Sequence, residues 1–535
     1  MKNFACYFIL SVFLHVLPVA AMAGEISLLP QPKELINLDK TLVLKKNISV
    51  YLDPGFRSSE HFVRSMLMDK GFNPRFVEKL SSADIIFSID KNLAKEKDGY
   101  KLTVIRHGSK AKIQALANSK NGLVYSLSTI HQLINNNGDR IEVPSCEVYD
   151  YPYFPWRAFM LDEARHFHGM EVVKKLLDEM VHLKMNIFHW HLTDDTGWRL
   201  EIKKYPLLTD IGSRSNFSLI NNSITPFDTD RLPKDKKWYY TQDEIRDIVK
   251  YADERGIVVI PEIEVPGHVS ASLYAYPWLG ASSKKLNKTV YGDLYDVTDP
   301  KVEQFILNVL DEVIALFPGK IIHIGGDEAN YAHWKDSPEI NDFMKQNNIS
   351  NYMDLQIWSI NRLSKYINSK GARMIGWNEI TGENIRNEAH VPKSESEVLA
   401  PGTIVQFWDG DVSLVNRAIE KGYDVVNSNR FFTYLDYNYE TSPLQKVYSF
   451  NPIPEGLDES KQKKILGLGA QSWGEYTPDT ERLYFQVFPR IAALSECGWV
   501  GPAKKTTYEN FRKRLVKSEL RWKNLGYLKF QVDKY

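Results

Sequence analysis

Two adjacent carboxylates that follow two glycines are the residues of this chain best suited to chemistry. The segment 323–328 reads His-Ile-Gly-Gly-Asp-Glu, so the two acids are Asp327 and Glu328. Neighbouring side chains of an extended segment point in opposite directions, so the pair can serve two different atoms of one substrate. Glycine lets a ligand approach the backbone closely. A solvated acidic loop is the alternative, but the apolar segment 321–324 before the pair is typical of a buried strand.

Other polar and aromatic side chains also stand at or just after apolar segments of the chain. They are Arg165, Asp194, His268, Trp377, Trp408, Tyr434, Asp436, Trp473 and Glu475. Carboxylates bind hydroxyl groups and transfer protons, and indole faces stack on the apolar faces of pyranose rings. A large apolar core explains most of the 12 tryptophans. Those beside acids or glycines favour a site for sugar chemistry.

Eight short apolar segments, most of them followed by an amphipathic helix, must position these side chains within residues 151–505. The segments are 157–161, 186–192, 257–263, 321–324, 373–377, 404–408, 424–427 and 465–472. The pattern predicts an α/β fold, a (β/α)8 TIM barrel, whose active site lies at the carboxyl ends of the strands. A doubly wound open sheet is the alternative, but no glycine-rich turn follows the first strand.

The chain on either side of the barrel predicts a smaller domain before it and a helix after it. Residues 24–150 contain strand-like runs at 41–44, 48–51 and 83–89, a hairpin signal over 100–116 and a helical run over 121–134. This pattern predicts a small α+β domain. Residues 506–535 predict a helix and a tail packed on the barrel.

The first 23 residues have the pattern of a signal peptide. Lys2 precedes an apolar run over 8–19, and residues 21–23 read Ala-Met-Ala, which fits a cleavage site. An uncleaved membrane anchor is the alternative, and no later segment predicts a membrane span. We expect export to the periplasm or the medium of a bacterium, since Cys146 and Cys497 offer no disulfide framework. Lys+Arg and Asp+Glu both number 67, which gives no reason to expect a nucleic-acid partner.

Taken together, the motifs resemble glycoside hydrolase family 20, the β-N-acetylhexosaminidases. The resemblance includes the small N-terminal domain and covers residues 25–500. Its motifs are Leu-Asp-x-x-Arg-His-Phe at 161–167, His-Trp-His-Leu-x-Asp-Asp at 189–195, Pro-Glu-Ile-Glu-x-Pro-Gly-His at 261–268, the acid pair at 323–328, Gly-Trp at 376–377, Tyr-x-Asp at 434–436 and Trp-Gly-Glu at 473–475.

The resemblance implies a role for each candidate residue. Glu328 resembles the general acid/base, Asp327 the residue that supports the acetamido N–H, and Tyr434 the donor to the acetamido oxygen, which acts as nucleophile. Trp377, Trp408 and Trp473 resemble the pocket walls, and Arg165 and Glu475 the clamps on distant hydroxyls. Asp194, His268 and Asp436 resemble supporting polar residues. The family implies exo-acting release of terminal N-acetylhexosamine from a glycan, without metal or cofactor, and leaves a homodimer open.

Several alternatives stay open beside that assignment. Asp is expected at the position of Glu264 and an acid at that of Asn378, so substrate preference is less certain than class. His189 and His191 share one face of a strand and could hold zinc together with His268 or Asp194. A disaccharide-releasing relative of the lacto-N-biosidase type and a non-catalytic glycan-binding protein are further alternatives. The segments 216–235 and 384–397 are expected to be rim loops.

Overall fold

The computed structural model describes residues 26–93, 96–108, 110–214, 236–385 and 392–528. The expected signal peptide, the expected rim loop 216–235 and the last part of the C-terminal tail therefore lie outside the described residues, as does most of the central part of the other rim loop. Among the described residues, no helix has both the length and the apolar character that a membrane crossing requires. Cys146 and Cys497 are buried and free, so no disulfide joins them.

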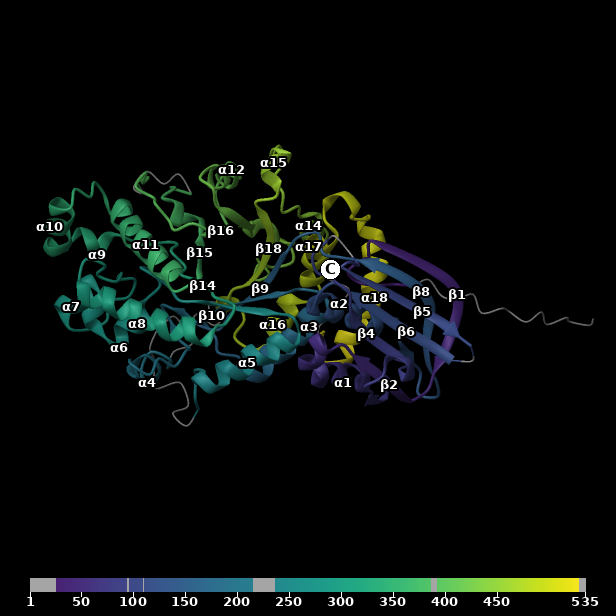
Figure 1. The fold of residues 1–535 in the computed structure, drawn as a ribbon. Helices are drawn as coiled ribbons and strands as arrows, with labels where there is room; N and C mark the ends of the chain where they lie inside the picture. Colours follow the sequence, from purple (N-terminus) through teal and green to yellow (C-terminus); the bar gives the residue numbers. More distant parts are fainter. Residues whose placement is uncertain (1–25, 94–95, 109, 215–235, 386–391, 529–535) are drawn as a thin grey trace, which may run out of the picture.

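Eight parallel strands close into a barrel, which confirms the predicted fold class (Figure 1). The neighbours in order around the barrel are β10, β13, β14, β15, β16, β17, β18 and β9. Their bounds are β9 Trp156–Asp162, β10 Ile187–His191, β13 Val258–Glu262, β14 Ile321–His323, β15 Arg373–Trp377, β16 Ile404–Phe407, β17 Asp424–Asn427 and β18 Ile465–Ser472. Each of the eight predicted segments coincides with one of these strands to within two residues at either end.

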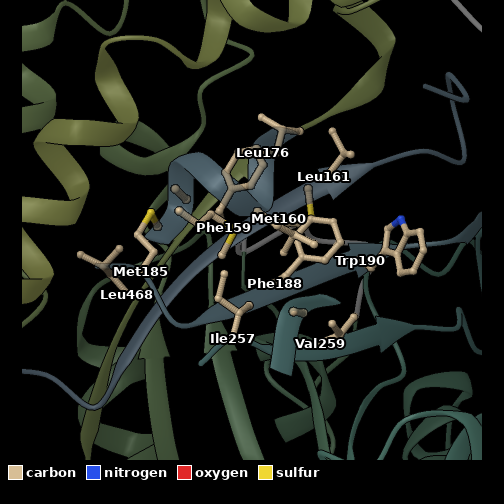
Figure 2. Close-up of a cluster of buried hydrophobic side chains, with 14 of the residues drawn as sticks. Phe159, Met160, Leu161, Leu176, Met185, Phe188, Trp190, Ile257, Val259 and Leu468 are labelled. Atoms are coloured by element: carbon tan, nitrogen blue, oxygen red, sulfur yellow. The ribbon is translucent and has the colours of Figure 1, made fainter. Parts of the chain in front are cut away.

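Helices, most of them amphipathic, cover the outside of the barrel. They include α3 (Met170–His182), α5 (Gln242–Glu254), α8 (Pro300–Leu316), α11 (Tyr352–Ser369), α12 (Ser413–Glu420), α16 (Thr480–Val487) and α17 (Arg490–Val500). The apolar stripe of α8 is buried, from Val302 to Leu316. Thr241 caps α5 by a capping box with Glu244, which fixes where that helix begins. Figure 2 shows the core between α3 and the strands, where Leu176 lies near Phe159 and Phe188.

Shorter elements occupy the loops between strands and helices. They are β11 Thr193–Asp194, β12 Gly197–Trp198, α4 Leu207–Asp210, α6 Ser270–Ala275, α7 Ala281–Leu286, α9 Ala332–Lys335, α10 Pro338–Gln346, η4 Asn378–Thr381, α13 Arg430–Thr433, α14 Leu444–Ser449, α15 Glu459–Gln462 and η5 Gly474–Tyr476. Several of these loops follow the carboxyl ends of strands, so they shape the face on which barrel enzymes carry their active sites.

The strands change character from one end of the barrel to the other. At the amino-terminal end, a separate cluster that includes Ile187, Ile260 and Ile404 fills the interior. Side chains of a strand alternate between faces, so residues two positions further along the strands also point inward. These are His189 on β10 and Glu262 on β13, both buried. Because of this alternation, the interior of the barrel is apolar toward the amino-terminal ends of the strands and polar toward their carboxyl ends.

The N-terminal part of the chain forms a mixed sheet that α1 and α2 cover. The strands are β1 Glu34–Leu44, β2 Asn47–Leu52, β3 Asn73–Phe76, β4 Ile85–Ile89, β5 Tyr100–His107, β6 Lys110–Ala117, β7 Asn135–Asn136 and β8 Ile141–Asp150, and the helices are α1 Glu60–Asp69 and α2 Lys120–Leu133. The order is β1-β8-β5-β6-β4-β2-β3, and β7 pairs with β8. This is the predicted α+β arrangement.

The sheet joins the barrel through helices that lie between them (Figure 1). Helix α2 contacts both the sheet and α3 of the barrel. Helix α18 (Tyr508–Asn524) joins the same junction, since Arg521 and Trp522 both bind Glu179 of α3. These contacts lie away from the carboxyl ends of the strands, so the junction supports the barrel without forming its mouth.

Candidate active site

The carboxyl ends of the barrel strands bring the predicted polar residues together around Arg165. Its guanidinium lies 3.0 Å from Asp162 Oδ2, 2.8 Å from Asp194 Oδ2 and 3.6 Å from Glu475 Oε1. It also lies over the ring of Trp473 at 5.2 Å. Arg165 therefore connects the ends of the first, second and eighth strands in chain order, and a planar fork of donors at such a point can bind hydroxyl groups.

A buried glutamate on β13 anchors the floor of the site. Glu262 is completely buried and accepts hydrogen bonds from His191 Nδ1 at 2.7 Å and from Trp377 Nε1 at 2.8 Å. His189 Nε2 and His323 Nδ1 each lie 2.8 Å from its carboxyl oxygens. These contacts gather side chains from four strands, so Glu262 fixes the positions of the groups above it.

His191 connects Glu262 to Asp194. Its Nδ1 bonds to Glu262 and its Nε2 lies 3.0 Å from Asp194 Oδ2, so both ring nitrogens face carboxylates. Burial lowers the pKa of His191, but Glu262 and Asp162 outweigh burial and raise it to about 10. Burial likewise opposes ionisation of Asp194, but Arg165 and His268 outweigh it and hold its pKa below the ordinary value.

His268 connects Asp194 to the acid pair. Its Nδ1 lies 3.5 Å from Asp194 Oδ1 and 3.3 Å from Asp195 Oδ2. Its Nε2 lies 3.7 Å from Asp327 Oδ2 and 3.6 Å from Glu328 Oε2. Burial opposes the charged ring, but Asp194, Asp195 and Asp327 together raise its pKa well above the ordinary value. The imidazole therefore presents a positive charge to both acids.

The two adjacent acids occupy different environments. The Asp327 side chain is 10% exposed, whereas the Glu328 side chain is 42% exposed. Burial raises the pKa of Asp327 to about 7; the charge of His268 lowers it and that of Glu328 adds to the rise. Glu328 and His268 both have positive φ, 49° and 54°, which is costly for residues other than glycine. Such backbone conformations cluster at functional sites.

The two glycines before the acid pair are required by space as well as conformation. Gly325 and Gly326 have φ of 65° and 90°. A Cβ at Gly325 would lie 1.7 Å from Glu264 Oε2, and one at Gly326 would lie 2.7 Å from Ile380 Cγ2. The chain can therefore turn from β14 toward the acids only because these residues lack side chains.

Four aromatic side chains form the wall opposite the acids. The ring centroid of Trp377 lies 6.4 Å from that of Trp408 and 5.8 Å from that of Trp473. Tyr434 is stacked on Trp408 at 6.2 Å and an interplanar angle of 10°, and its centroid lies 5.9 Å from that of Trp473. All but Trp473 are buried. These flat apolar faces can enclose a sugar and a small apolar substituent.

Several carboxyl oxygens of the site have no protein partner. Within the described residues, these buried oxygens without a hydrogen-bond partner are Asp327 Oδ1, Glu264 Oε2, Asp436 Oδ1 and Glu475 Oε2. Burial raises the pKa of Asp436 to about 8, with Glu475 adding to the rise. Buried polar groups are otherwise almost always bonded, so unsatisfied atoms that share one site point to a ligand with several polar groups.

The two departures from the expected motif have different consequences. The carboxyl group of Glu264 lies against Gly325, where burial and the charge of Asp327 raise its pKa well above the ordinary value. Asn378 is buried and links two strands, because its side chain bonds to Asp409 O and to the N–H of Trp408. The next residue, Glu379, accepts from Trp408 Nε1 at 3.0 Å. An acid therefore still lines this part of the site.

The histidines considered as zinc ligands all lie against carboxyl groups. His189 and His191 both contact Glu262, and His191 also contacts Asp194. His268 lies between four carboxyl groups. Three-residue groups with ligand atoms within 4.8 Å of one another exist here, such as His189, Glu262 and His323. Loss of activity on chelation is what the zinc alternative predicts.

Comparisons with protein families and with related proteins agree with a site for sugar chemistry. The model of the glycosyl hydrolase family 20 catalytic domain matches residues 154–502, and that of its domain 2 matches residues 25–151. A β-hexosaminidase from Vibrio furnissii is 32% identical over 90% of this chain and 77% of its own length. One from Porphyromonas gingivalis is 34% identical over 82% of this chain, which spans 55% of that relative.

Solved structures give the same result. The exo-β-N-acetylglucosaminidase from Vibrio harveyi, in complex with N-acetylglucosamine, has a TM-score of 0.81 at 29% identity and covers 96% of this chain and 79% of its own. The β-N-acetylhexosaminidase from Bacteroides fragilis has a TM-score of 0.79 at 28% identity, with 94% and 96% covered. The chain therefore belongs to glycosyl hydrolase family 20 and is a glycoside hydrolase of the β-N-acetylhexosaminidase class.

Proposed function

We propose that the protein removes single terminal β-linked N-acetylglucosamine or N-acetylgalactosamine residues from the non-reducing ends of glycans, with net retention. The observation that carries this proposal is the contrast within the acid pair, where Asp327 is buried and Glu328 is exposed. Two neighbouring carboxyl groups with different surroundings can take two different roles in one reaction.

Glu328 serves as the general acid and then as the general base. It protonates the glycosidic oxygen while the acetamido oxygen of the substrate attacks C1, which expels the leaving group and forms a cyclic oxazolinium ion. Glu328 then takes a proton from water, which attacks C1 and reopens the ring. The exposure of Glu328 suits both the leaving group and the incoming water. His268, held by Asp194 and Asp195, orients it.

Asp327 and Tyr434 hold the acetamido group in position for attack. Asp327 accepts its N–H and stabilises the positive charge that develops on nitrogen, and the unsatisfied Oδ1 supports this role. Tyr434 donates to the acetamido oxygen and aims it at C1. The buried rings of Trp377 and Trp408 supply apolar surface for the acetamido methyl group.

Arg165, Asp194, Asp436 and Glu475 bind the hydroxyl groups of the same sugar. Asp436 Oδ1 and Glu475 Oε2 offer unused acceptors, and Arg165 offers donors beside them. Release of one sugar is supported by the similarity to the exo-acting enzyme of Vibrio harveyi, whose structure holds N-acetylglucosamine. The bacterial relatives and the N-terminal pattern support an exported bacterial enzyme.

The test is hydrolysis of an aryl β-N-acetylglucosaminide beside the matching aryl β-glucoside. We expect cleavage of the first only, and Glu328→Gln should lower its kcat roughly 10²–10⁴-fold. Equal cleavage of both sugars would contradict a nucleophilic acetamido group. Release of an intact disaccharide from a longer glycan, without cleavage of the monosaccharide substrate, would favour the disaccharide-releasing alternative. Binding of glycans without cleavage would favour the non-catalytic one.

A further inference from the structure

The loop between α13 and α14, which carries two residues of the pocket, is held by a buried arginine of α17. Arg490 is completely buried at the first position of that helix. Its guanidinium donates to the carbonyl oxygen of Leu435, to that of Tyr437 at 2.8 Å and to that of Ser442 at 3.3 Å. One side chain therefore binds the backbone on both sides of Asp436 and again shortly before α14.

A glutamine at the end of α16 adds a further bond to the same loop. Gln486 is also completely buried, and its Nε2 donates to the carbonyl oxygen of Asp436 at 3.0 Å. Its Oε1 accepts from Arg490 Nη2 at 2.9 Å. The carbonyl oxygens of three successive residues, 435–437, thus all accept hydrogen bonds from this pair. Because a guanidinium holds its donors in a fixed plane, it can bind several acceptors only in one arrangement.

Strand β18 fixes the start of the same segment. The N–H of Leu435 donates to the carbonyl oxygen of Gln471 at 2.7 Å, and Thr433 Oγ1 donates to Gln471 Oε1 at 3.0 Å. Tyr434 is extended and pairs with Gln471 as a parallel bridge. Side chains of an extended segment alternate, so Tyr434 and Asp436 share the face toward the pocket while Leu435 points away. The backbone bonds therefore set where these two side chains lie.

The position of Tyr434 matters for the chemical step. In the proposed mechanism its hydroxyl donates to the acetamido oxygen and aims that oxygen at C1. A displacement of about 1 Å of a group that orients a reacting atom can cost roughly 10²-fold in rate. A group that fixes the backbone next to Tyr434 can therefore control the rate without touching the substrate.

We propose that Arg490 is a positioning residue, which together with Gln486 holds Tyr434 and Asp436 in place against the terminal sugar. This inference rests on the proposed function, because it requires Tyr434 to orient the acetamido group. It predicts that a change at Arg490 lowers kcat through Tyr434, in addition to any loss of stability.

The experiment compares the full-length wild-type enzyme with Arg490→Lys, Tyr434→Phe and the double variant. The readouts are kcat and KM for an aryl β-N-acetylglucosaminide, measured on folded enzyme. Lysine keeps the charge but cannot span the same carbonyl groups, so kcat should fall roughly 10–10²-fold. Tyr434→Phe should lower kcat roughly 10²–10³-fold. In the double variant kcat should fall less than about twofold below that of Tyr434→Phe, because a residue that acts through another gives losses that do not add.

Arg157→Lys is the matched control. Arg157 is also completely buried, and its guanidinium donates to the carbonyl oxygens of Phe154 at 2.6 Å and Lys184 at 2.8 Å. It lies near the amino-terminal end of β9, away from the site. We expect Arg157→Lys and Arg490→Lys to lower the melting temperature by similar amounts, and only Arg490→Lys to lower kcat.

The outcomes separate this inference from the proposed function. Equal kcat for Arg490→Lys and wild type, or losses that multiply fully in the double variant, would overturn this inference alone. An unchanged kcat in Tyr434→Phe would overturn the role proposed for Tyr434 and this inference with it. If Arg490→Lys does not fold, Gln486→Met replaces it in the same comparison. That variant should lower kcat roughly two- to tenfold, again without adding to Tyr434→Phe, and a fully multiplied loss would overturn the inference.

Discussion

Buried charges occur in two regions of this molecule and are treated differently in each. At the junction of the sheet and the barrel, Lys184 Nζ lies 2.8 Å from Asp150 Oδ2 and 2.9 Å from Tyr100 OH. The other oxygen of Asp150 accepts from Trp499 Nε1 at 2.9 Å. At the mouth of the barrel, Asp327, Asp436 and Glu475 each keep one buried oxygen without a protein partner.

This difference separates charges that hold the structure together from charges kept for a ligand. At the junction each contact is made within the protein, so the charges fix how the two parts meet. At the mouth, burial without full bonding raises the pKa of Asp327 and Asp436, which destabilises the ionised protein. Proteins accept such local instability where function requires it.

The largest effect on stability is expected at the junction. Lys184→Met leaves Asp150 buried without its cation, which should lower the free energy of unfolding by about 3–5 kcal/mol. The value of kcat should be unchanged in the fraction that stays folded, as denaturant titration and kinetics can measure. Lys101→Met, which breaks the exposed pair with Glu147, is the control and should cost under about 1 kcal/mol. Similar losses of unfolding free energy in the two variants would contradict the claim that the buried ion pair of the junction stabilises the fold more than an exposed pair does.

The largest effect on catalysis is expected from Asp327→Asn at the mouth. The amide keeps the shape but loses the charge that supports the acetamido N–H, so kcat/KM should fall roughly 10²–10³-fold. The melting temperature should stay equal or rise, because a buried and incompletely bonded carboxylate is removed. A strong loss of stability with modest loss of activity would place Asp327 among the structural charges instead.

Asp436→Asn should change how the free energy of unfolding depends on pH. The pKa of Asp436 is about 8 in the folded protein, above the value of about 3.9 expected when unfolded. The folded state therefore binds the extra proton between these values, and the wild type loses stability as pH rises from 4 to 8. The variant lacks this loss, so its advantage should grow to roughly 1–3 kcal/mol at pH 8. A difference independent of pH would contradict the assignment.

His268→Asn should give the smallest effect, which is a shift of the acidic limb in the pH profile of kcat/KM. The proposed mechanism uses Asp327 ionised, so kcat/KM rises with pH through its pKa in the free enzyme. The charge of His268 lowers that pKa, so its loss should move the limb to higher pH by up to about one unit. An unchanged or lower limb, measured on the residual activity, would show that His268 does not act on Asp327.

The fold was predictable wherever apolar periodicity was strong. The apolar stripe of α8 indicates a helix with one buried face, and the eight short apolar segments indicate buried strands. The loop helices α6, α7, α9 and α10 were not predicted, since short helices depend on contacts with neighbours more than on their own sequence. The strand β8 was also missed, although its burial alternates and it pairs with β1, β5 and β7.

The candidate site was predictable as a set of residues but not as a network. Arg165, Asp194, His268 and the acid pair come together as expected from strand ends. Glu262 and Glu379 were given no role, because their importance depends on which side chains the barrel register places beside them. A signal existed for Glu262, since the His-x-His pattern at 189–191 indicates an inward face that needs an acceptor.

We propose that the mouth of the barrel keeps its charges for an acetamido group that acts as the nucleophile. The most direct measurement is kcat/KM for aryl glycosides whose N-acetyl group carries zero, one, two or three fluorine atoms. Each fluorine withdraws electrons from the acetamido oxygen and weakens its attack on C1. We expect kcat/KM to fall steeply with each added fluorine. Values independent of fluorine number would contradict it, and would require a nucleophile supplied by the protein or by water.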